Sequence, residues 1–179
     1  MLRRVSIREA KVSDRLEVAG VHVRSWQAAY EGLLPTDFLS GLKVEDRAAR
    51  YTFGETSLYD PVTKVAIEDD AIVGFVTCGT YRDPSRSDCG EVYALYVDPI
   101  YWQRGVGREL MASAKDHLLR MSFIKAYLWV LEGNQRAMAF YESDGWFADG
   151  MVRRDVIGGV SVGEIRYECD LGAKFEAQN

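Results

Sequence analysis

The feature that most constrains this chain is the stretch from Glu91 to Arg108, which reads EVYALYVDPIYWQRGVGR. Residues 92–97 form a short apolar run rich in β-branched and aromatic side chains, which is typical of a strand buried on both faces. Asp98-Pro99 ends this run, because proline lacks a backbone N–H and restricts the residue before it. A loop with two glycines follows, and then a helix is expected. The stretch therefore predicts a buried strand joined by a tight loop to a helix.

The loop Gln103-Arg104-Gly105-Val106-Gly107-Arg108 has the properties of an anion site. Its glycines let a ligand approach the backbone, and the first N–H groups of the helix have no intrahelical partners. The helix dipole favours phosphate at this end, and the two arginines add positive charge. A tight turn without a ligand is the alternative from this stretch alone. The spacing excludes a dinucleotide fingerprint, because Leu110 stands at its third glycine position, and the chain has no P-loop string.

The stretch resembles the signature of the GNAT superfamily of N-acetyltransferases, in which a loop [RQ]-x-x-G-x-[GA] follows a strand of the LYV type. Trp102 replaces the usual Gln or Arg, whereas the backbone-donating positions 103–108 are intact. A second segment is similar to the family's N-x-x-A-x-x-F-Y-x-x-x-G-[FW] region and reads Asn134-x-x-Ala137-x-x-Phe140-Tyr141-Glu142-x-x-Gly145-Trp146. The two motifs occur in the family's order and at its usual distance. The resemblance is therefore specific, and it covers most of the chain.

The remaining patterns predict the other elements of the fold. Strands are expected near residues 5–7, 64–68, 72–78, 125–130, 152–157 and 160–170, and helices over residues 14–30, 36–39, 44–51, 105–120 and after Asn134. We therefore predict one α/β (α+β) domain over residues 1–172 and a frayed tail over 173–179. The resemblance implies the GNAT fold, a mixed, mostly antiparallel central sheet of about seven strands flanked by helices on both sides. It also implies that the strand carrying Leu95 to Val97 splays away from the strand ending at Val130.

Local details of the fold are predicted as well. Asp14 and Glu17 have the spacing of an acidic capping box at the start of the first helix. One apolar stripe along that helix is expected to contain Leu16, Ala19, Val23, Trp26 and Tyr30. Gly158-Gly159 predicts a two-residue hairpin turn. The alternation of apolar residues changes phase in the last strand, which predicts a bulge near Gly163.

The resemblance implies direct transfer of an acetyl group from acetyl-CoA, the co-substrate, to a primary amine. Backbone N–H groups of the loop would bind the pyrophosphate, the strand edge would bind the pantetheine amides, and an N–H near Val97 would stabilise the developing oxyanion. No cysteine falls in a recognisable nucleophile motif, which fits direct transfer. The predicted cofactor-binding residues are Leu95, Tyr96, Val97, Gln103, Arg104, Gly105, Val106, Gly107, Arg108, Asn134 and Tyr141.

The catalytic and substrate-binding residues each have an alternative role. In the family, a tyrosine at the position of Tyr141 protonates the departing thiolate, so the resemblance implies that Tyr141 is the acid. A phenol with a pKa of ~10 can do this; the alternative is a buried aromatic residue. Glu91 is the candidate base, directly or through a water, and the alternatives are an exposed strand-end residue or a water chain. Asn134 would bind the cofactor arm or serve only as an N-cap. Trp26 and Tyr30 would wall the acceptor pocket or pack in the core.

Composition limits the classes of partner that the protein is expected to bind. The formal net charge of −5 argues against nucleic acid and weakly favours a cationic amine. The three cysteines and two histidines fall in no metal motif, so no metal is expected. No apolar run approaches the ~18 residues of a membrane span and no secretory segment is recognised, so we predict a cytoplasmic protein without a membrane partner. The predicted acceptor is a small molecule. The alternatives are a peptide or protein amine and a non-catalytic acyl-CoA sensor, and the resemblance makes a homodimer an open expectation.

Overall fold

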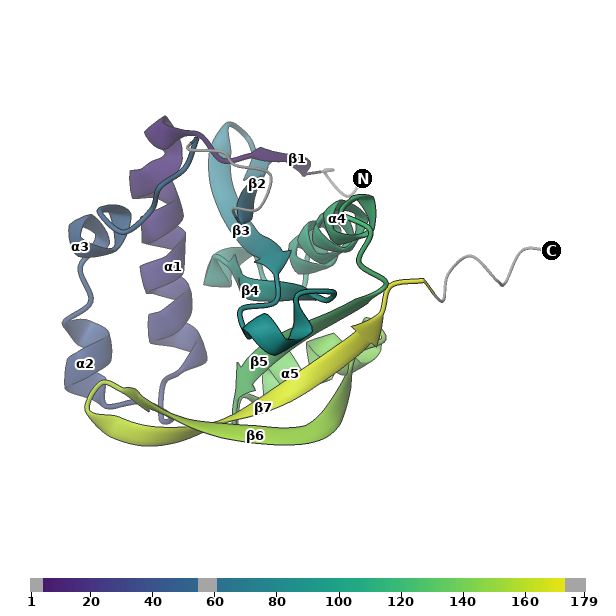
Figure 1. Ribbon diagram of the computed structural model, residues 1–179. Helices are drawn as coiled ribbons and strands as arrows, with labels where there is room; N and C mark the ends of the chain where they lie inside the picture. The colour runs from purple at the N-terminus through teal and green to yellow at the C-terminus, as the bar shows by residue number, and fades with distance from the viewer. Residues whose placement is uncertain (1–4, 55–60, 173–179) are drawn as a thin grey trace.

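The computed structural model describes residues 5–54 and 61–172, and within them one sheet has the strand order β1-β2-β3-β4-β5-β7-β6 (Figure 1). Every neighbouring pair of strands is antiparallel except β4 and β5, which are parallel. The predicted mixed, mostly antiparallel sheet is therefore confirmed. The predicted frayed tail lies outside the described residues. The strands are β1 Ser6–Glu9, β2 Val62–Glu68, β3 Ala71–Thr80, β4 Gly90–Val97, β5 Lys125–Leu131, β6 Phe147–Ile157 and β7 Val160–Asp170.

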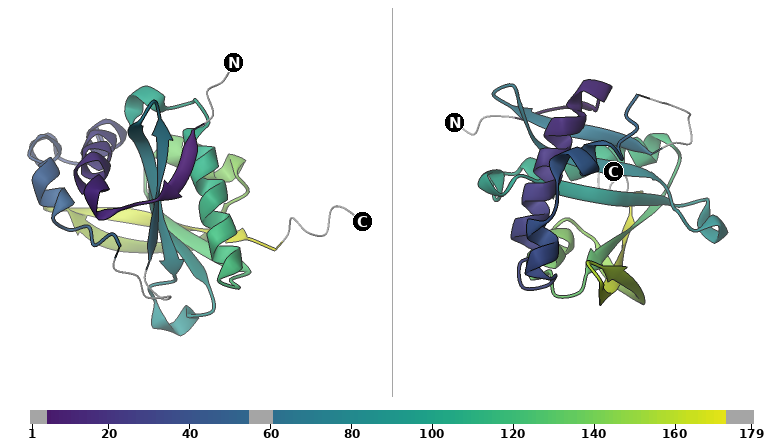
Figure 2. Two further views of the ribbon diagram at one scale, coloured as in Figure 1. Left: turned by 90° about the horizontal axis from the view of Figure 1, so that it is seen from above. Right: turned by 90° about the vertical axis from the view of Figure 1, so that its left-hand side faces the viewer.

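Helices cover both faces of the sheet, as predicted. Helices α1 Arg15–Ala29, α2 Thr36–Ser40 and α3 Val44–Ala48 lie on one side, and α4 Val106–Arg120 and α5 Gln135–Ser143 lie on the other (Figure 2). Short 3-10 turns occupy Val12–Asp14, Pro84–Arg86 and Pro99–Tyr101. Within the described ranges, no helix combines the length and apolar character needed to cross a membrane.

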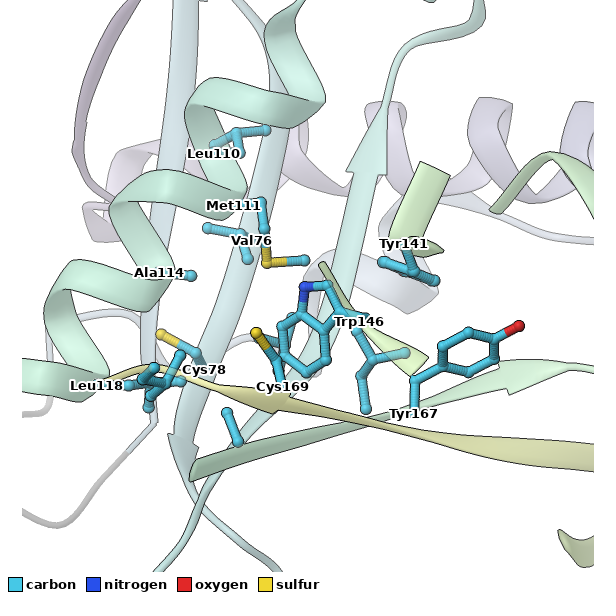
Figure 3. Close-up of a cluster of buried hydrophobic side chains, with 14 of the residues drawn as sticks. Val76, Cys78, Leu110, Met111, Ala114, Leu118, Tyr141, Trp146, Tyr167 and Cys169 are labelled. Carbon is cyan, nitrogen blue, oxygen red and sulfur yellow. The ribbon is translucent and has the colours of Figure 1, made fainter. Parts of the chain in front are cut away.

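The main core lies between the sheet and the helices α4 and α5. Leu110, Ala114 and Leu118 are fully buried along one face of α4. Figure 3 shows them beside Trp146 and other buried side chains of the same cluster. A side chain of this size contributes roughly 1.5–3 kcal/mol when it is fully buried. This packing fixes the start of α4, and it also holds α5, which carries Tyr141 in the same cluster.

The first helix differs from the sequence prediction. Ala19 and Val23 of the predicted stripe are buried, but Leu16 is 60% exposed. Val18, Val21 and His22 are buried as well, because this part of α1 packs against the sheet. The predicted capping box is also wrong. The Asp14 carboxylate accepts hydrogen bonds from Arg8 and from the backbone of Lys11, so it ties β1 to the helix start. The Arg8 hydrogen bond lowers the pKa of Asp14.

The C-terminal hairpin has the predicted turn, since Gly158 and Gly159 both have positive φ angles of 60° and 80°. The predicted bulge at Gly163 is wrong, because the irregularity lies in β6 between residues 148 and 152. The phase change has another cause. Val162 packs in a cluster with Leu34 and Leu39, whereas the later residues of β7 pack in the main core on the opposite face.

Candidate active site

The wedge between β4 and β5 is the centre of the candidate site. These described strands pair only at Gly90 with Ala126 and at Glu91 with Tyr127, and then they diverge. The predicted splay is therefore confirmed. Beyond this point β4 has β3 as its strand neighbour on one side and no strand neighbour on the other. The backbone of β4 consequently offers a free edge to a ligand.

The direction of each backbone group along β4 follows from one hydrogen bond. The Asp98 N–H donates to Val73 O in β3, so the alternation of a strand turns the backbone groups of Leu95 and Val97 toward the wedge. Val97 O already accepts hydrogen bonds from Ser25 Oγ (2.8 Å) and Trp102 Nε1 (2.7 Å). The groups at the free edge are therefore the N–H and C=O of Leu95 and the N–H of Val97. The backbone of Val97 was predicted to form part of the free strand edge, but only its N–H is available there.

The pairing of β3 with β4 contains a register shift. Thr77 of β3 pairs with Ala94, but the next residue, Cys78, pairs with Val92. Tyr93 is thus skipped, which is the arrangement of a β-bulge. Bulges turn backbone groups and side chains out of their regular directions, and this one lies at the wedge. It was not predicted from the sequence.

A cavity of about 350 Å³ extends from the wedge to the start of α4. It brings together most of the predicted cofactor-binding residues and several residues that the sequence analysis did not assign. The lining residues are Leu95, Val97, Tyr101, Trp102, Gln103, Gly105, Val106, Gly107, Arg108, Arg136, Ala137 and Phe140. Its size lies within the usual range of ligand pockets.

The loop at the end of this cavity has an unusual backbone conformation. Gln103 (φ 61°) and Gly105 (φ 87°) are both left-handed, and such turns direct successive N–H groups to one side and form an anion-binding concavity. The Arg108 N–H donates to Gly105 O, so it is not free to bind a ligand, contrary to the prediction. The N–H groups of Val106 and Gly107, in the first turn of α4, have no intrahelical acceptor.

The two glycines of the loop are required for different physical reasons. A Cβ on Gly105 would meet nothing within 4 Å, so this residue is required by its positive φ and not by packing. A Cβ on Gly107 would lie 3.5 Å from Phe140 and would project among the residues that line the cavity. The loop therefore keeps its backbone accessible at both positions.

Two arginines near the cavity stack on aromatic rings. The Arg136 guanidinium lies 3.0 Å from the centre of the Trp102 ring, and both residues line the cavity. Arg104 lies 5.1 Å from the Tyr101 ring and does not line the cavity. The sequence analysis missed Arg136, although its position between Asn134 and Ala137 in the second motif was an available signal. Trp102 was noted only as a departure from the motif.

A second cavity, of about 40 Å³, lies in the wedge itself. Tyr30, Trp129, Asn134 and Tyr141 are among its lining residues, together with residues 92–96 of β4. Tyr141 is 9% exposed, and burial raises the pKa of its hydroxyl. The phenol is therefore protonated at neutral pH, which is the form that an acid requires. Asn134 Oδ1 accepts a hydrogen bond from Ala137 N, so it is an N-cap that also borders the wedge.

Glu91, the predicted base, is 1% exposed and is held by Arg82. Its Oε2 accepts from the Arg82 backbone N–H (2.9 Å) and its Oε1 from Arg82 Nε (3.0 Å). The hydrogen bond to Glu91 raises the pKa of Arg82, so the guanidinium stays charged. Glu91 lines neither cavity described above. Its role as a base stays a prediction.

The predicted acceptor residues belong to an aromatic cluster on the α1 side. Tyr30 lines the wedge cavity, and its hydroxyl lies 3.5 Å from that of Tyr96. Trp26 packs edge-on against Tyr30 at 5.1 Å, but it does not line either cavity. The ring of Tyr96 lies 4.8 Å from the ring of His22. The position of Tyr96 in β4 directs its backbone N–H and C=O toward β3 and away from the wedge. Tyr30 thus lines the site, whereas Trp26 packs against Tyr30 outside both cavities.

The sheet face below this cluster carries charged and aromatic side chains that the sequence analysis did not assign. Trp129 lines the wedge cavity, and Arg153 stacks on its ring at 4.2 Å. Arg153 also pairs with Glu164, with an Nε–Oε2 distance of 2.6 Å. No short motif contains these residues, because they come from β5, β6 and β7. Only the strand register places them together.

Comparisons with known proteins agree with this geometry. Residues 26–146 match the family described as "Acetyltransferase (GNAT) family". The uncharacterized N-acetyltransferase YuaI of Bacillus subtilis is 30% identical over 139 residues, which is 78% of each chain. The PaiA N-acetyltransferase of Thermoplasma acidophilum, solved in complex with coenzyme A, has a TM-score of 0.73 and 19% identity, covering 94% of this chain and 99% of that chain. YncA of Salmonella typhimurium, a putative acetyltransferase solved with its cofactor acetyl-CoA, has a TM-score of 0.70 and 17% identity, covering 94% and 95%.

Proposed function

This chain belongs to the acetyltransferase (GNAT) family, and we propose that it transfers an acetyl group from acetyl-CoA to the amino group of a small primary amine. One observation carries the proposal. The strands β4 and β5 part after two residue pairs, and the free edge of β4 leads through one cavity to the glycine loop. This arrangement provides a continuous path for a long ligand with an anionic end.

The residues along this path fit acetyl-CoA, which supplies the acetyl group as a reactive thioester. The N–H groups of Val106 and Gly107 would bind the pyrophosphate at the positive end of α4. The N–H and C=O of Leu95 would bind an amide of the pantetheine arm, as in an added strand. Ala137 and Phe140 supply the apolar wall that the arm requires.

The transfer step then uses groups around the wedge. The amine nitrogen attacks the carbonyl carbon, the new C–N bond forms, and the C–S bond breaks with its electron pair on sulfur. We assign Val97 N–H as the donor to the carbonyl oxygen, a role that contributes roughly 3 kcal/mol in comparable sites. The Tyr141 hydroxyl gives its proton to the departing sulfur, and the proton that the nitrogen loses as it becomes an amide restores the phenol. Burial raises the pKa of Tyr141, but the same burial makes a thiolate more basic, so the proton transfer stays feasible.

Before it attacks, the ammonium form of the acceptor must lose a proton. Glu91 is our proposed base, acting through a water because it lines neither cavity. Arg82 donates three hydrogen bonds to this carboxylate, which has about four lone-pair positions, so one remains for a water.

The size of the acceptor is the next part of the proposal. The β6–β7 turn packs closely on α2, since a Cβ on Gly158 would lie 2.6 Å from Phe38 Cγ. A peptide acceptor needs an open groove along which its backbone can extend. The contact between the turn and α2 therefore supports a small acceptor. Tyr141 beside the wedge supports an enzyme over a non-catalytic sensor.

Release of free CoA, followed with a thiol reagent across a panel of primary amines, tests this function. We expect release that depends on both acetyl-CoA and an amine. A parallel thermal-shift measurement reports cofactor binding, because a ligand at ~100 times its Kd should add about 2.7 kcal/mol of stability. A thermal shift without CoA release from any amine would support the sensor instead, and no shift at all would contradict both.

A further inference from the structure

We propose that Trp129 and Glu164 form a binding site for a second positive charge on the acceptor, and that Arg153 occupies this site when no acceptor is bound. The acceptor is then a diamine or a related dication, with one amino group in the wedge and the other on this site. The inference rests on the proposed function, because the site is defined by its position next to the wedge.

The strand register places the three side chains on one face of the sheet. Arg153 of β6 pairs with Glu164 of β7, which in turn pairs with Leu131 of β5, and side chains of paired residues share a face. Trp129 lies two residues before Leu131 and so points to the same face. Leu131 packs with Leu34 and Leu39, which identifies this as the α1–α2 side of the sheet.

The contacts of Arg153 show what the site recognises. Its guanidinium lies 4.2 Å from the centre of the Trp129 ring, and its Nε lies 2.6 Å from Glu164 Oε2. An indole face and a carboxylate together attract a cation by two independent electrostatic effects. Arg153 therefore shows the position and the charge of the group that this site binds.

Arg153 is suited to leave the site. Its side chain is 42% exposed, whereas that of Glu164 is only 15% exposed, and β6 is the outer strand of the sheet. Solvent therefore reaches the guanidinium and screens the ion pair on that side, and the released guanidinium can be hydrated. Arg166, whose guanidinium lies 5.8 Å from the centre of the Trp129 ring, is different. It is buried and holds Asp149 and Tyr81, so it is not a candidate for displacement.

The site adjoins the reacting groups. Trp129 lines the wedge cavity together with Tyr30 and Tyr141, so one side chain borders both the wedge and the cation position. The charge of Glu164 also reaches the wedge. Burial is the main cause that raises the pKa of Tyr30, and Glu164 adds to that increase. Trp129 is therefore the residue that links the cation position to the wedge.

Binding to the complex of the enzyme with CoA tests the site without requiring turnover. The probes are 1,4-diaminobutane, butylamine and 4-aminobutanoate, which share a four-carbon chain and differ in the second group. Calorimetry with the wild-type complex should show tighter binding of the diamine than of the other two. Glu164→Gln should weaken diamine binding about tenfold, because the variant keeps the shape of the site but loses its charge.

Arg153→Ala should tighten diamine binding about two- to fivefold, since the internal competitor is removed. Arg154→Ala is the matched control, because Arg154 lies next in β6, points to the opposite face and pairs with Gly163. It should leave diamine affinity unchanged. The preferences should appear again in the KM values for acetylation.

Other results would overturn the site. Equal binding of diamine and butylamine, or no response to Glu164→Gln, would remove it even if both amines are acetylated. A preference for 4-aminobutanoate that is lost in Arg153→Ala would show that Arg153 binds an acceptor carboxylate instead. Failure of the proposed function is a separate result, since it would appear as no acetyl-CoA thermal shift or no CoA release with any amine.

Discussion

The two sides of the wedge are built on different principles. On the cofactor side, the N–H groups of Val106 and Gly107 have no intrahelical acceptor, and the backbone groups of Leu95 have no strand partner among the described residues. These groups face a cavity of about 350 Å³. On the acceptor side, the charged side chains pair with each other, as Arg82 does with Glu91 and Arg153 with Glu164. The cofactor side is thus ready to bind, whereas the acceptor side must exchange internal contacts for those of a substrate.

This difference has a functional consequence. A ligand that binds to preformed backbone donors gains affinity without rearrangement of the protein. A ligand that displaces an internal ion pair gains only the difference between two similar interactions, so small changes in its shape or charge decide whether it binds. We therefore propose that the cofactor side binds a common coenzyme and that the acceptor side sets the selectivity.

The largest expected effect comes from Gly105→Val on the cofactor side. Valine is strongly disfavoured at the φ of 87° found at this position, so the loop must change conformation and lose its N–H groups as donors. We expect acetyl-CoA affinity to fall by at least about 100-fold, measured by calorimetry. Gly150→Val is the matched control, because Gly150 has the same φ and the same open surroundings but lies in β6. Equal affinity losses in both variants would attribute the effect to strain alone.

Tyr141→Phe should give the next largest effect, at the point where the two sides meet. Loss of a general acid lowers kcat by about 10²–10⁴-fold. Cofactor affinity should remain unchanged, because the ring and its packing are kept. Tyr167→Phe is the control, since the Tyr167 hydroxyl donates to Glu142 and its ring lies 6.1 Å from that of Tyr141. If Tyr141→Phe turns over at the wild-type rate, another group is the acid.

His22 tests the aromatic cluster behind the acceptor side. Burial lowers the pKa of His22 to about 3, and its Nδ1 lies 2.9 Å from the Tyr51 hydroxyl. The unfolded chain binds this proton at a pH near 6.5, so the free energy of unfolding should fall as the pH decreases from 6.5 toward 3. At pH 5 the loss should be about 2 kcal/mol.

The His22→Gln variant should show a flatter dependence of stability on pH in that window, measured by urea unfolding at several pH values. His117→Gln is a useful control, because His117 is on α4 and outside the cluster. An identical pH dependence in wild type and His22→Gln would show that other groups cause the acid sensitivity.

The smallest expected effect concerns Glu91 on the acceptor side. Glu91→Gln should lower kcat about tenfold at neutral pH, because a water would have to release the amine proton without a carboxylate. Arg82→Gln breaks the same ion pair but keeps the carboxylate, so it should retain more activity than Glu91→Gln. Equal losses in the two variants, together with equal losses of stability, would identify the pair as structural and would assign the base elsewhere.

The contrast between the two sides also explains how much of the molecule could be predicted from the sequence. The strand, loop and helix around Gly105 follow from local chemistry, since proline, glycine and an apolar run act within a few residues. The second motif likewise identified Asn134 and Tyr141. Both cavities contain residues from these segments.

The acceptor side could not be predicted in the same way. Trp129, Arg153 and Glu164 lie far apart in the chain and meet only through the register of β5, β6 and β7. The error at Gly163 has a similar cause, because Val162 is covered by residues near α2 that no local pattern connects to it. Leu16 fits the spacing of the stripe on α1 but is exposed, whereas Ala19 and Val23 of the same stripe are buried, so spacing alone does not show where the buried stripe begins.

A crystal structure with bound CoA tests the central claim most directly. The account predicts pyrophosphate oxygens at about 2.9 Å from the backbone nitrogens of Val106 and Gly107, with the thiol end beside Leu95 in the wedge. A diphosphate held by arginine side chains away from this loop, or a thiol end outside the wedge, would contradict it.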